Sequence, residues 1–128
     1  MRLSSVVLGV VVDKAIAILT IGALMAFFDA TSQIFQNTAL VAGFLATTVG
    51  AFVAGHHAKH RAVAHGVAVG LAAFVISFSR FALATYFSSP DSSAAHPFSW
   101  ELIAWASVIA AGFAGGHIAS RANESRAA

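Results

Sequence analysis

Four histidines stand close together in one short stretch of the chain, VAGHHAKHRAVAHG at residues 53–66. His56 and His60 are four residues apart, so they would share one face if a helix continued through this stretch. That spacing suits two ligands of a metal ion, and His117 could supply a third. A haem would need two axial histidines that face one another at matched depth, and His56 and His117 sit at matched depth by the repeat of the two halves, but at the membrane edge.

A simpler interpretation places these histidines at a membrane surface. Lys59 and Arg61 lie among them, and basic side chains at the end of a helix stabilise its last carbonyl groups. They also attract anionic lipid headgroups. No carboxylate stands nearby in the sequence to orient the imidazoles as ligands. We therefore favour a basic turn in contact with lipid and expect no metal or cofactor. A pH sensor and a haem or metal site stay open as alternatives.

Asp13 and Lys14 lie about ten residues into the first apolar stretch, where charged residues are functional candidates. Asp13 could couple transport to protons or cations, with Lys14 tuning it. Alternatively, Lys14 reaches the membrane surface and hydrogen bonds inside the bundle neutralise Asp13. Adjacent residues on a helix point about 100° apart, so we do not expect the two to be an ideal mutual pair.

Arg80 is a further intramembrane charge, about two helical turns before the end of its apolar stretch. Arginine keeps its charge in proteins, so it needs an acidic partner. We expect Arg80 to pair with Glu101 or with Asp29, which fall near the same interface. A structural clamp is the favoured role, and an anion or lipid-headgroup site is the alternative.

The composition indicates a membrane protein. Of the 128 residues 59% are hydrophobic and 9% are charged, and the mean hydropathy is +0.83; soluble domains carry about a quarter of their residues as charges. The absence of cysteine excludes disulfides, thiolate metal sites and cysteine nucleophiles. The basic residues form no amphipathic face, so we expect no nucleic-acid partner. No nucleophile–base or phosphate-loop motif is present, and we expect no enzymatic activity.

Crossing a membrane as a helix takes about 20 apolar residues. Four stretches qualify, and they cover residues 3–28, 38–56, 62–87 and 99–118. They predict an all-α polytopic membrane protein, a single transmembrane domain over residues 1–128. We expect Asn37 or Thr38 to cap the second helix and Ser99 the fourth. Because apolar sequence continues beyond the first charged residues, we expect the first helix to be retained and not cleaved as a signal.

The placement of lysine and arginine predicts the orientation. The loops at 29–37 and 88–98 hold neither residue, whereas the middle turn and both ends of the chain do. By the positive-inside rule, the middle turn and both termini are cytoplasmic, in an inner (plasma) membrane. An aromatic belt is expected at the opposite interface, formed by Tyr86, Phe87, Phe98, Trp100 and Trp105.

The two halves of the chain look alike. FVAGHHA at 52–58 aligns with FAGGHIA at 113–119, and the same shift places VVLG at 6–9 over VAVG at 67–70. This pattern predicts a tandem repeat of two helical hairpins, related by an axis along the membrane normal.

Small residues recur every four positions in the second and fourth stretches, and in lipid such stripes let helix backbones approach closely. They pack one bundle, form an oligomer interface, or do both. Besides the lipid bilayer, we expect a homo-oligomer or a larger membrane complex as partner. The predicted packing glycines are Gly50 and Gly55 in the second stretch and two G-x-x-x-G pairs, Gly66 with Gly70 in the third stretch and Gly112 with Gly116 in the fourth.

GAFVAGHHA at 50–58, followed by Ala64-His65-Gly66 and Gly70, resembles a group of uncharacterised small bacterial four-helix membrane proteins. Those proteins carry a Gly-rich helix end, a basic cytoplasmic turn and a His-Gly pair that opens the next helix. The resemblance implies the fold and topology predicted above, and no settled activity. This chain departs from the pattern by having histidines at 56 and 57 where an arginine is expected.

The favoured function is therefore that of a small structural or accessory membrane component that self-associates. The first alternative is a proton- or cation-coupled small-molecule transporter that uses Asp13. Small exporters of this length carry an embedded glutamate in the first helix, and this chain has only Asp13 there. The second alternative is a haem- or metal-binding membrane subunit.

Overall fold

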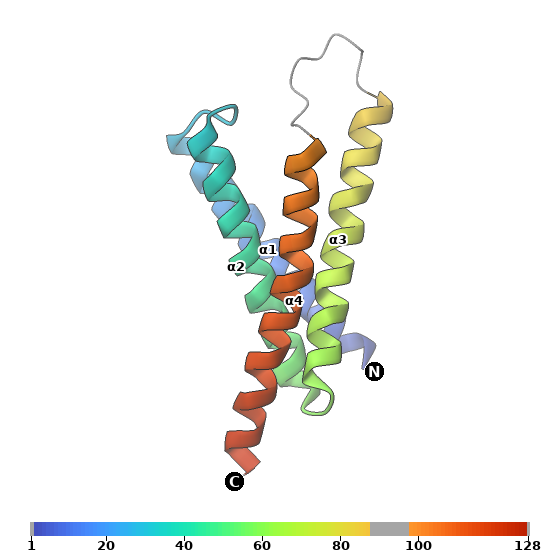
Figure 1. Ribbon diagram of the computed structural model, residues 1–128. Coiled ribbons are helices and arrows are strands. Elements are labelled where there is room, and N and C mark those ends of the chain that lie inside the picture. Colours follow the sequence, from blue (N-terminus) through green and yellow to red (C-terminus); the bar gives the residue numbers. More distant parts are fainter. Residues whose placement is uncertain (1, 88–97, 128) are drawn as a thin grey trace.

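The computed structural model describes residues 2–87 and 98–127, which form four helices (Figure 1). They are α1 (Leu3–Phe27), α2 (Gln33–Ala58), α3 (Ala62–Phe87) and α4 (Phe98–Ala127). Each helix is long and apolar enough to cross a membrane, and no strand occurs in this part of the chain. The predicted all-α fold with four candidate membrane-spanning helices is confirmed.

The second helix begins earlier than its most apolar stretch. Ser32 is the N-cap of α2, and its hydroxyl accepts a hydrogen bond from the backbone N–H of Phe35 at 3.2 Å. This bond satisfies one of the N–H groups that a helix start leaves unpaired. The expectation that Asn37 or Thr38 caps this helix is wrong, because both lie inside α2.

The fourth helix also differs from its prediction at both ends. It begins at Phe98, so Ser99 lies within the first turn and is not the cap; the residue before Phe98 lies outside the described residues. At the other end α4 runs to Ala127, well past the predicted limit at residue 118. This extension carries the polar segment at 120–126 beyond the end of α2.

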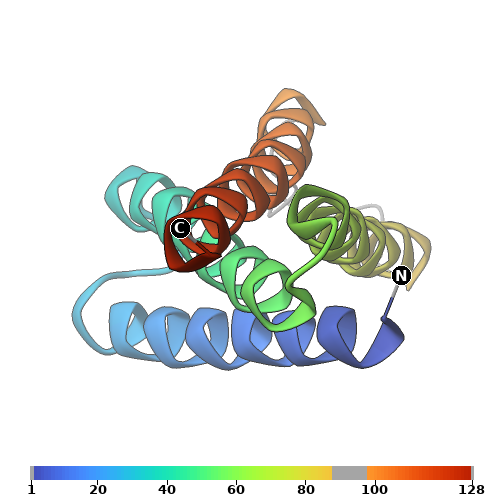
Figure 2. The same ribbon diagram turned by 90° about the horizontal axis from the view of Figure 1, so that it is seen from below.

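The four helices form two hairpins that are joined mainly through α2. In the described residues α2 contacts each of the other three helices, whereas α1 and α4 do not contact one another. Seen from below, α1 runs at a steep angle to the other helices (Figure 2). Both termini and the turn between α2 and α3 lie at one end of the bundle (Figure 1). We name it the basic end, after Arg2, Lys59, Arg61, Arg121 and Arg126, and the opposite end the loop end.

Glycines make the closest crossing between α1 and α2. A Cβ placed on Gly9 would lie 2.6 Å from the carbonyl oxygen of Gly50 and 2.8 Å from a methyl group of Val69. A Cβ placed on Gly50 would lie 2.8 Å from the Cβ of Asp13. Neither position has room for a side chain. Such backbone approach gains dispersion contacts that hold helices together in lipid.

Glycines also join α3 to α4. A Cβ on Gly66 would lie 2.5 Å from the Cα of Gly116, and one on Gly70 would lie 3.1 Å from the Cα of Gly112. The shift that relates the two halves places Gly9 over Gly70, and each of these glycines packs against the partner helix of its own hairpin. This match supports the predicted repeat.

A third close crossing joins the hairpins. A Cβ on Gly55 in α2 would lie 2.8 Å from the Cβ of Ala119 in α4, and one on Gly115 would lie 2.8 Å from the Cβ of Ala51. The small-residue stripes are therefore used to pack helices within one chain. All six glycines that were predicted to pack helices lie at such crossings within the chain. They are Gly50, Gly55, Gly66, Gly70, Gly112 and Gly116.

Among the described residues, all the buried ones except Trp105 lie in the half of the bundle near the basic end. Within residues 14–45, 74–87 and 98–104, no residue is buried. Toward the loop end the two hairpins diverge (Figure 1). Large apolar side chains are exposed there, including Met25 at 61% and Leu83 at 57%. Lipid or another membrane-embedded chain must cover them.

Trp105 does not belong to an aromatic belt at the interface. It is only 7% exposed and packs edge-on between α3 and α4, an arrangement that aromatic rings favour. Tyr86 and Phe87, in contrast, are exposed at the loop end of α3. The rings around Trp105, with centroids 5.4 to 6.0 Å away, are those of Phe74, Phe78, Phe81 and Phe98.

Candidate functional site

Asp13 is buried about midway along α1, with its residue 1% exposed. Thr47 of α2 donates a hydrogen bond to its Oδ1 at 3.0 Å. The Nζ of Lys14 lies 2.9 Å from its Oδ2, so the two adjacent residues form an ion pair. Our expectation of poor pairing is wrong, because the lysine side chain, 34% exposed, is long enough to reach the carboxylate of its neighbour.

The surroundings of Asp13 indicate a tie between α1 and α2. Gly50 lies directly against its Cβ, so the two backbones are close at this level. Both carboxylate oxygens have a partner, although Oδ2 accepts no well-aligned hydrogen bond in the described residues and is held by charge alone. A buried carboxylate is costly unless it is paired in this way. This arrangement matches neither sequence interpretation in full, because Lys14 pairs with Asp13 and one hydrogen bond reaches the carboxylate from α2.

Arg80 and Glu101 are not brought together. Across residues 2–87 and 98–127, no ion pair joins Arg80 to Glu101 or to Asp29, so the predicted clamp does not form there. Arg80 is exposed on α3 toward the loop end, and Glu101 is half-buried in the first turn of α4. A carboxylate in that turn is favoured by the helix dipole.

His56 and His117 have similar but separate surroundings. Each imidazole stacks on the phenylalanine four residues earlier: Phe52 lies 5.5 Å and 10° from His56, and Phe113 lies 6.3 Å and 8° from His117. This shared feature again supports the repeat. The two imidazoles share no hydrogen bond in the described chain. His56 Nε2 lies 3.1 Å from a guanidinium nitrogen of Arg126, whereas His117 is exposed.

The predicted histidine candidates do not form a metal-binding cluster in the described residues. No group of three or more His, Cys, Asp or Glu side chains there is placed to hold a metal ion. His60 does not join His56 on one helical face, because α2 ends at Ala58 and the turn that follows redirects the chain. His60 instead lines a pocket at the basic end.

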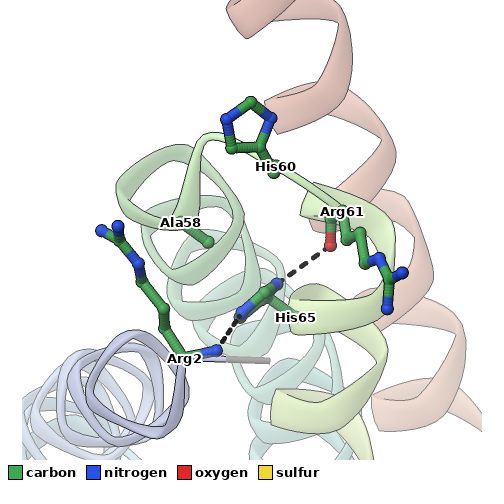
Figure 3. Close-up of a pocket in the computed structure, with 5 residues that line it drawn as sticks. All are labelled: Arg2, Ala58, His60, Arg61 and His65. Carbon is green, nitrogen blue, oxygen red and sulfur yellow. Dashed lines mark hydrogen bonds between the residues drawn. The ribbon is translucent and has the colours of Figure 1, made fainter.

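His65 is the most connected histidine, although it was not among the predicted site residues. It is 3% exposed, and its Nε2 accepts a hydrogen bond from the backbone N–H of Arg2 at 3.0 Å (Figure 3). Its Nδ1 lies 3.0 Å from the carbonyl oxygen of Arg61. Because a carbonyl only accepts, Nδ1 must carry the proton and Nε2 must be the acceptor. A neutral His65 therefore ties the start of α1 to the turn before α3.

The turn between α2 and α3 has an unusual backbone. Lys59 and Arg61 have φ angles of 60° and 54°, which residues other than glycine rarely adopt. The N–H of His60 donates to the carbonyl oxygen of Ala58 at 2.6 Å, which makes a tight three-residue turn centred on Lys59. The chain thus reverses direction with two strained basic residues and no glycine.

Two side chains from other positions hold this turn. His65 contacts the carbonyl oxygen of Arg61, as described above. Asn123, in the extended part of α4, has its Nδ2 3.3 Å from the carbonyl oxygen of Gly55 and 3.4 Å from that of Lys59. These are carbonyl groups that the end of α2 leaves without helical partners. The tail of α4 therefore caps α2.

A pocket of about 150 Å³ opens beside His65. Figure 3 shows Arg2 and Arg61 on opposite sides of it, with their guanidinium groups directed away from one another. No acidic side chain lines this pocket. Its lining consists of Arg2, Ala58, His60, Arg61 and His65.

Comparison with known proteins identifies one family. The model of the family described as "Protein of unknown function (DUF3792)" matches residues 2–119, which is nearly the whole chain. The match agrees with the resemblance to uncharacterised proteins drawn from the sequence, and it assigns no activity. No curated protein and no solved structure matches the chain.

Proposed function

We propose that this chain, which belongs to the family described as "Protein of unknown function (DUF3792)", is a small accessory component of a membrane that self-associates. Its contact surface is the half of the bundle near the loop end. The observation that carries the proposal is the uneven burial along the helices.

A bundle that is complete in itself buries side chains along the full length of its helices. Here the half near the basic end is closed by glycine and alanine contacts, whereas residues 14–45 include no buried position. The open half also carries exposed hydroxyl groups. Thr38, Ser79 and Thr85 each donate to a carbonyl of their own helix. In lipid, such hydroxyls can also bond across to a neighbouring helix.

The glycine stripes do not provide the association surface. The predicted stripe glycines lie at crossings within the chain, where an added Cβ would meet neighbouring atoms. Substituting Gly50 or Gly112 by leucine would therefore disrupt the bundle itself. Association has to use the exposed side chains near the loop end, such as Met25 and Leu83.

We infer the orientation from charge. Five of the seven Lys and Arg residues, those that define the basic end, gather there. By the positive-inside rule this end faces the cytoplasm of an inner (plasma) membrane. The chain has no native cysteine, so a single cysteine can be introduced at Ser125 to probe the basic end or at Thr31 to probe the loop end. A membrane-impermeant thiol reagent then labels only the cysteine that faces the outside of the cell. Labelling of intact cells at Ser125 and not at Thr31 would contradict this orientation.

The test of self-association is the number of copies per particle when the protein is reconstituted in lipid nanodiscs and measured by native mass spectrometry. We expect two or more copies. Leu83→Ala should shift the distribution toward one copy, and Leu71→Ala, on the same helix but in the half near the basic end, should not; the two leucines are 57% and 47% exposed. A single copy at every protein-to-lipid ratio contradicts the proposal.

One observation favours the transporter alternative: a carboxylate is buried in mid-membrane, at Asp13. A proton-coupled cycle would have to break its ion pair with Lys14 and its bond from Thr47 at each turnover. In proteoliposomes, Asp13→Asn should abolish coupled uptake if the chain is such a transporter. Flux that is unchanged by this substitution rules the alternative out.

A further inference from the structure

The strained turn at the basic end needs an explanation that packing alone does not give. A short connection between two helices is commonly made with glycine, which adopts positive φ without steric cost. This turn instead places Lys59 and Arg61 at positive φ. Strained residues of this kind cluster at ligand clamps and other functional sites, where surrounding contacts maintain them. Here the contacts come from His65 and Asn123.

The two arginines of the pocket follow from this arrangement of the chain. Figure 3 shows Arg2 and Arg61 on opposite sides of the pocket, with their guanidinium groups directed outward and His60 and His65 between them. His65 uses the backbone N–H of Arg2 and the backbone carbonyl of Arg61. Within the part of the chain that the structure describes, neither guanidinium takes part in an ion pair. Both side chains can therefore turn toward a ligand while the backbone contacts stay in place.

The charge around the pocket selects an anion. Two arginines and two histidines line it, and the acidic residue of the described basic end, Glu124, lies on α4 and accepts a hydrogen bond from Ser120 at 3.2 Å. The volume of about 150 Å³ equals that of several water molecules, at roughly 30 Å³ each. A phosphate group fits a space of this size. Guanidinium groups bind phosphate through two parallel hydrogen bonds, which suits a site with an arginine on either side.

We propose that this pocket binds a phosphate group at the membrane surface, with Arg2 and Arg61 closing on it from two sides and His60 at the rim. The phosphate belongs either to the headgroup of an anionic lipid or to a free phosphate ion. In both cases His65 is a positioning residue, because it fixes the backbones that carry the two arginines. The proposal is independent of the self-association proposed above.

The test compares the removal of two positive charges from the pocket with the removal of two positive charges elsewhere at the basic end. Arg2→Gln/Arg61→Gln removes both guanidinium groups and keeps every backbone contact of His65. Arg121→Gln with Lys59→Gln removes the same charge from the same end of the bundle, at residues that do not line the pocket. Each protein is placed in nanodiscs of phosphatidylcholine alone, phosphatidylcholine with phosphatidylglycerol, or phosphatidylcholine with added inorganic phosphate. Native mass spectrometry and thermal unfolding report binding.

We expect the natural chain and the control variant to retain phosphatidylglycerol or phosphate and to unfold at a higher temperature in its presence. The pocket variant should bind about thirtyfold more weakly, as the loss of two cations near an anionic group implies. Stabilisation by phosphatidylglycerol alone identifies a lipid headgroup site, and stabilisation by inorganic phosphate identifies a free-ion site. Equal weakening in both variants, or no binding by the natural chain, overturns the proposal.

Discussion

The hydroxyl of Thr47 donates to the Asp13 carboxylate across the α1–α2 crossing, at 3.0 Å. The next residue, Thr48, donates instead to the carbonyl oxygen of Phe44 in its own helix, at 2.8 Å. One threonine of this pair joins two helices near the middle of α1 and α2, and its neighbour stabilises only a local contact. Substitutions at the two positions therefore distinguish the stability gained from a hydrogen bond between helices from the stability gained from a hydroxyl group within one helix.

Thr47→Val should lower the free energy of unfolding by about 1 kcal/mol, because the shape is kept while the Oδ1 of buried Asp13 loses its donor. Thr48→Val should change the free energy of unfolding by only about 0.3 kcal/mol, because no bond between helices is lost. Reversible unfolding in mixed micelles measures both. Equal effects of the two substitutions would argue against an interhelical tie at Asp13.

Gly9→Ala should destabilise the protein by about 1–3 kcal/mol, since the new Cβ would overlap the backbone of α2. Gly22→Ala, on the same helix with no atom within 4 Å of the added Cβ, should be neutral or stabilising by up to ~1 kcal/mol through helix propensity. The same unfolding assay compares them. If Gly9→Ala proved as harmless as Gly22→Ala, the close α1–α2 crossing would be incorrect.

His65→Phe should lower the free energy of unfolding by about 1 kcal/mol, because the ring is kept but the backbone N–H of Arg2 loses its acceptor and the carbonyl of Arg61 keeps only the backbone N–H of residue 65. His57→Phe, at an exposed position, serves as the control. Nitrogen-15 NMR should also find the proton of neutral His65 on Nδ1. A proton on Nε2 would be incompatible with the bond from Arg2.

Asp29 should titrate at low pH. The backbone N–H of Thr31, and then its hydroxyl, bond to the charged carboxylate and lower the pKa of Asp29 below its ordinary value. A group with a lowered pKa contributes stability above its unfolded pKa and loses it as the pH falls through the folded one. Thr31→Val keeps the N–H and should raise the pKa part of the way back, as measured by carbon-13 NMR. An unchanged pKa would show that the hydroxyl has no part in the shift.

The fold was predictable because hydropathy and length act locally along the chain. Four long apolar stretches specify four helices, and small residues at every fourth position mark where backbones can approach, as Gly50 and Gly66 do. Helix ends were less predictable. Ser32 caps α2, although Asn37 stands closer to the apolar stretch. The helix extends through the polar residues between them, and a polar side chain can either cap a helix or lie within it.

The candidate sites were less predictable than the fold, because they are formed by contacts between residues that are distant in the sequence. His65 lies four residues after Arg61, a spacing from which no contact was predicted, and nothing local pairs it with Arg2. The alignment of the two halves paired His56 with His117, but the stacking of each imidazole on a phenylalanine was not predicted. The alignment also did not predict that Arg126 reaches His56, since that contact arises from the extension of α4.

The most direct test of the account is cysteine crosslinking between copies in native membranes. The chain has no cysteine of its own, so each introduced thiol is unique. Met25→Cys and Leu83→Cys probe the half near the loop end, and Leu71→Cys and Phe113→Cys probe the half near the basic end; all four side chains are 47% to 61% exposed. We predict that mild oxidation yields a disulfide-linked dimer at one or both of the first two positions and at neither of the others. Crosslinking that is equal in both halves, or confined to the half near the basic end, would contradict association through the open half.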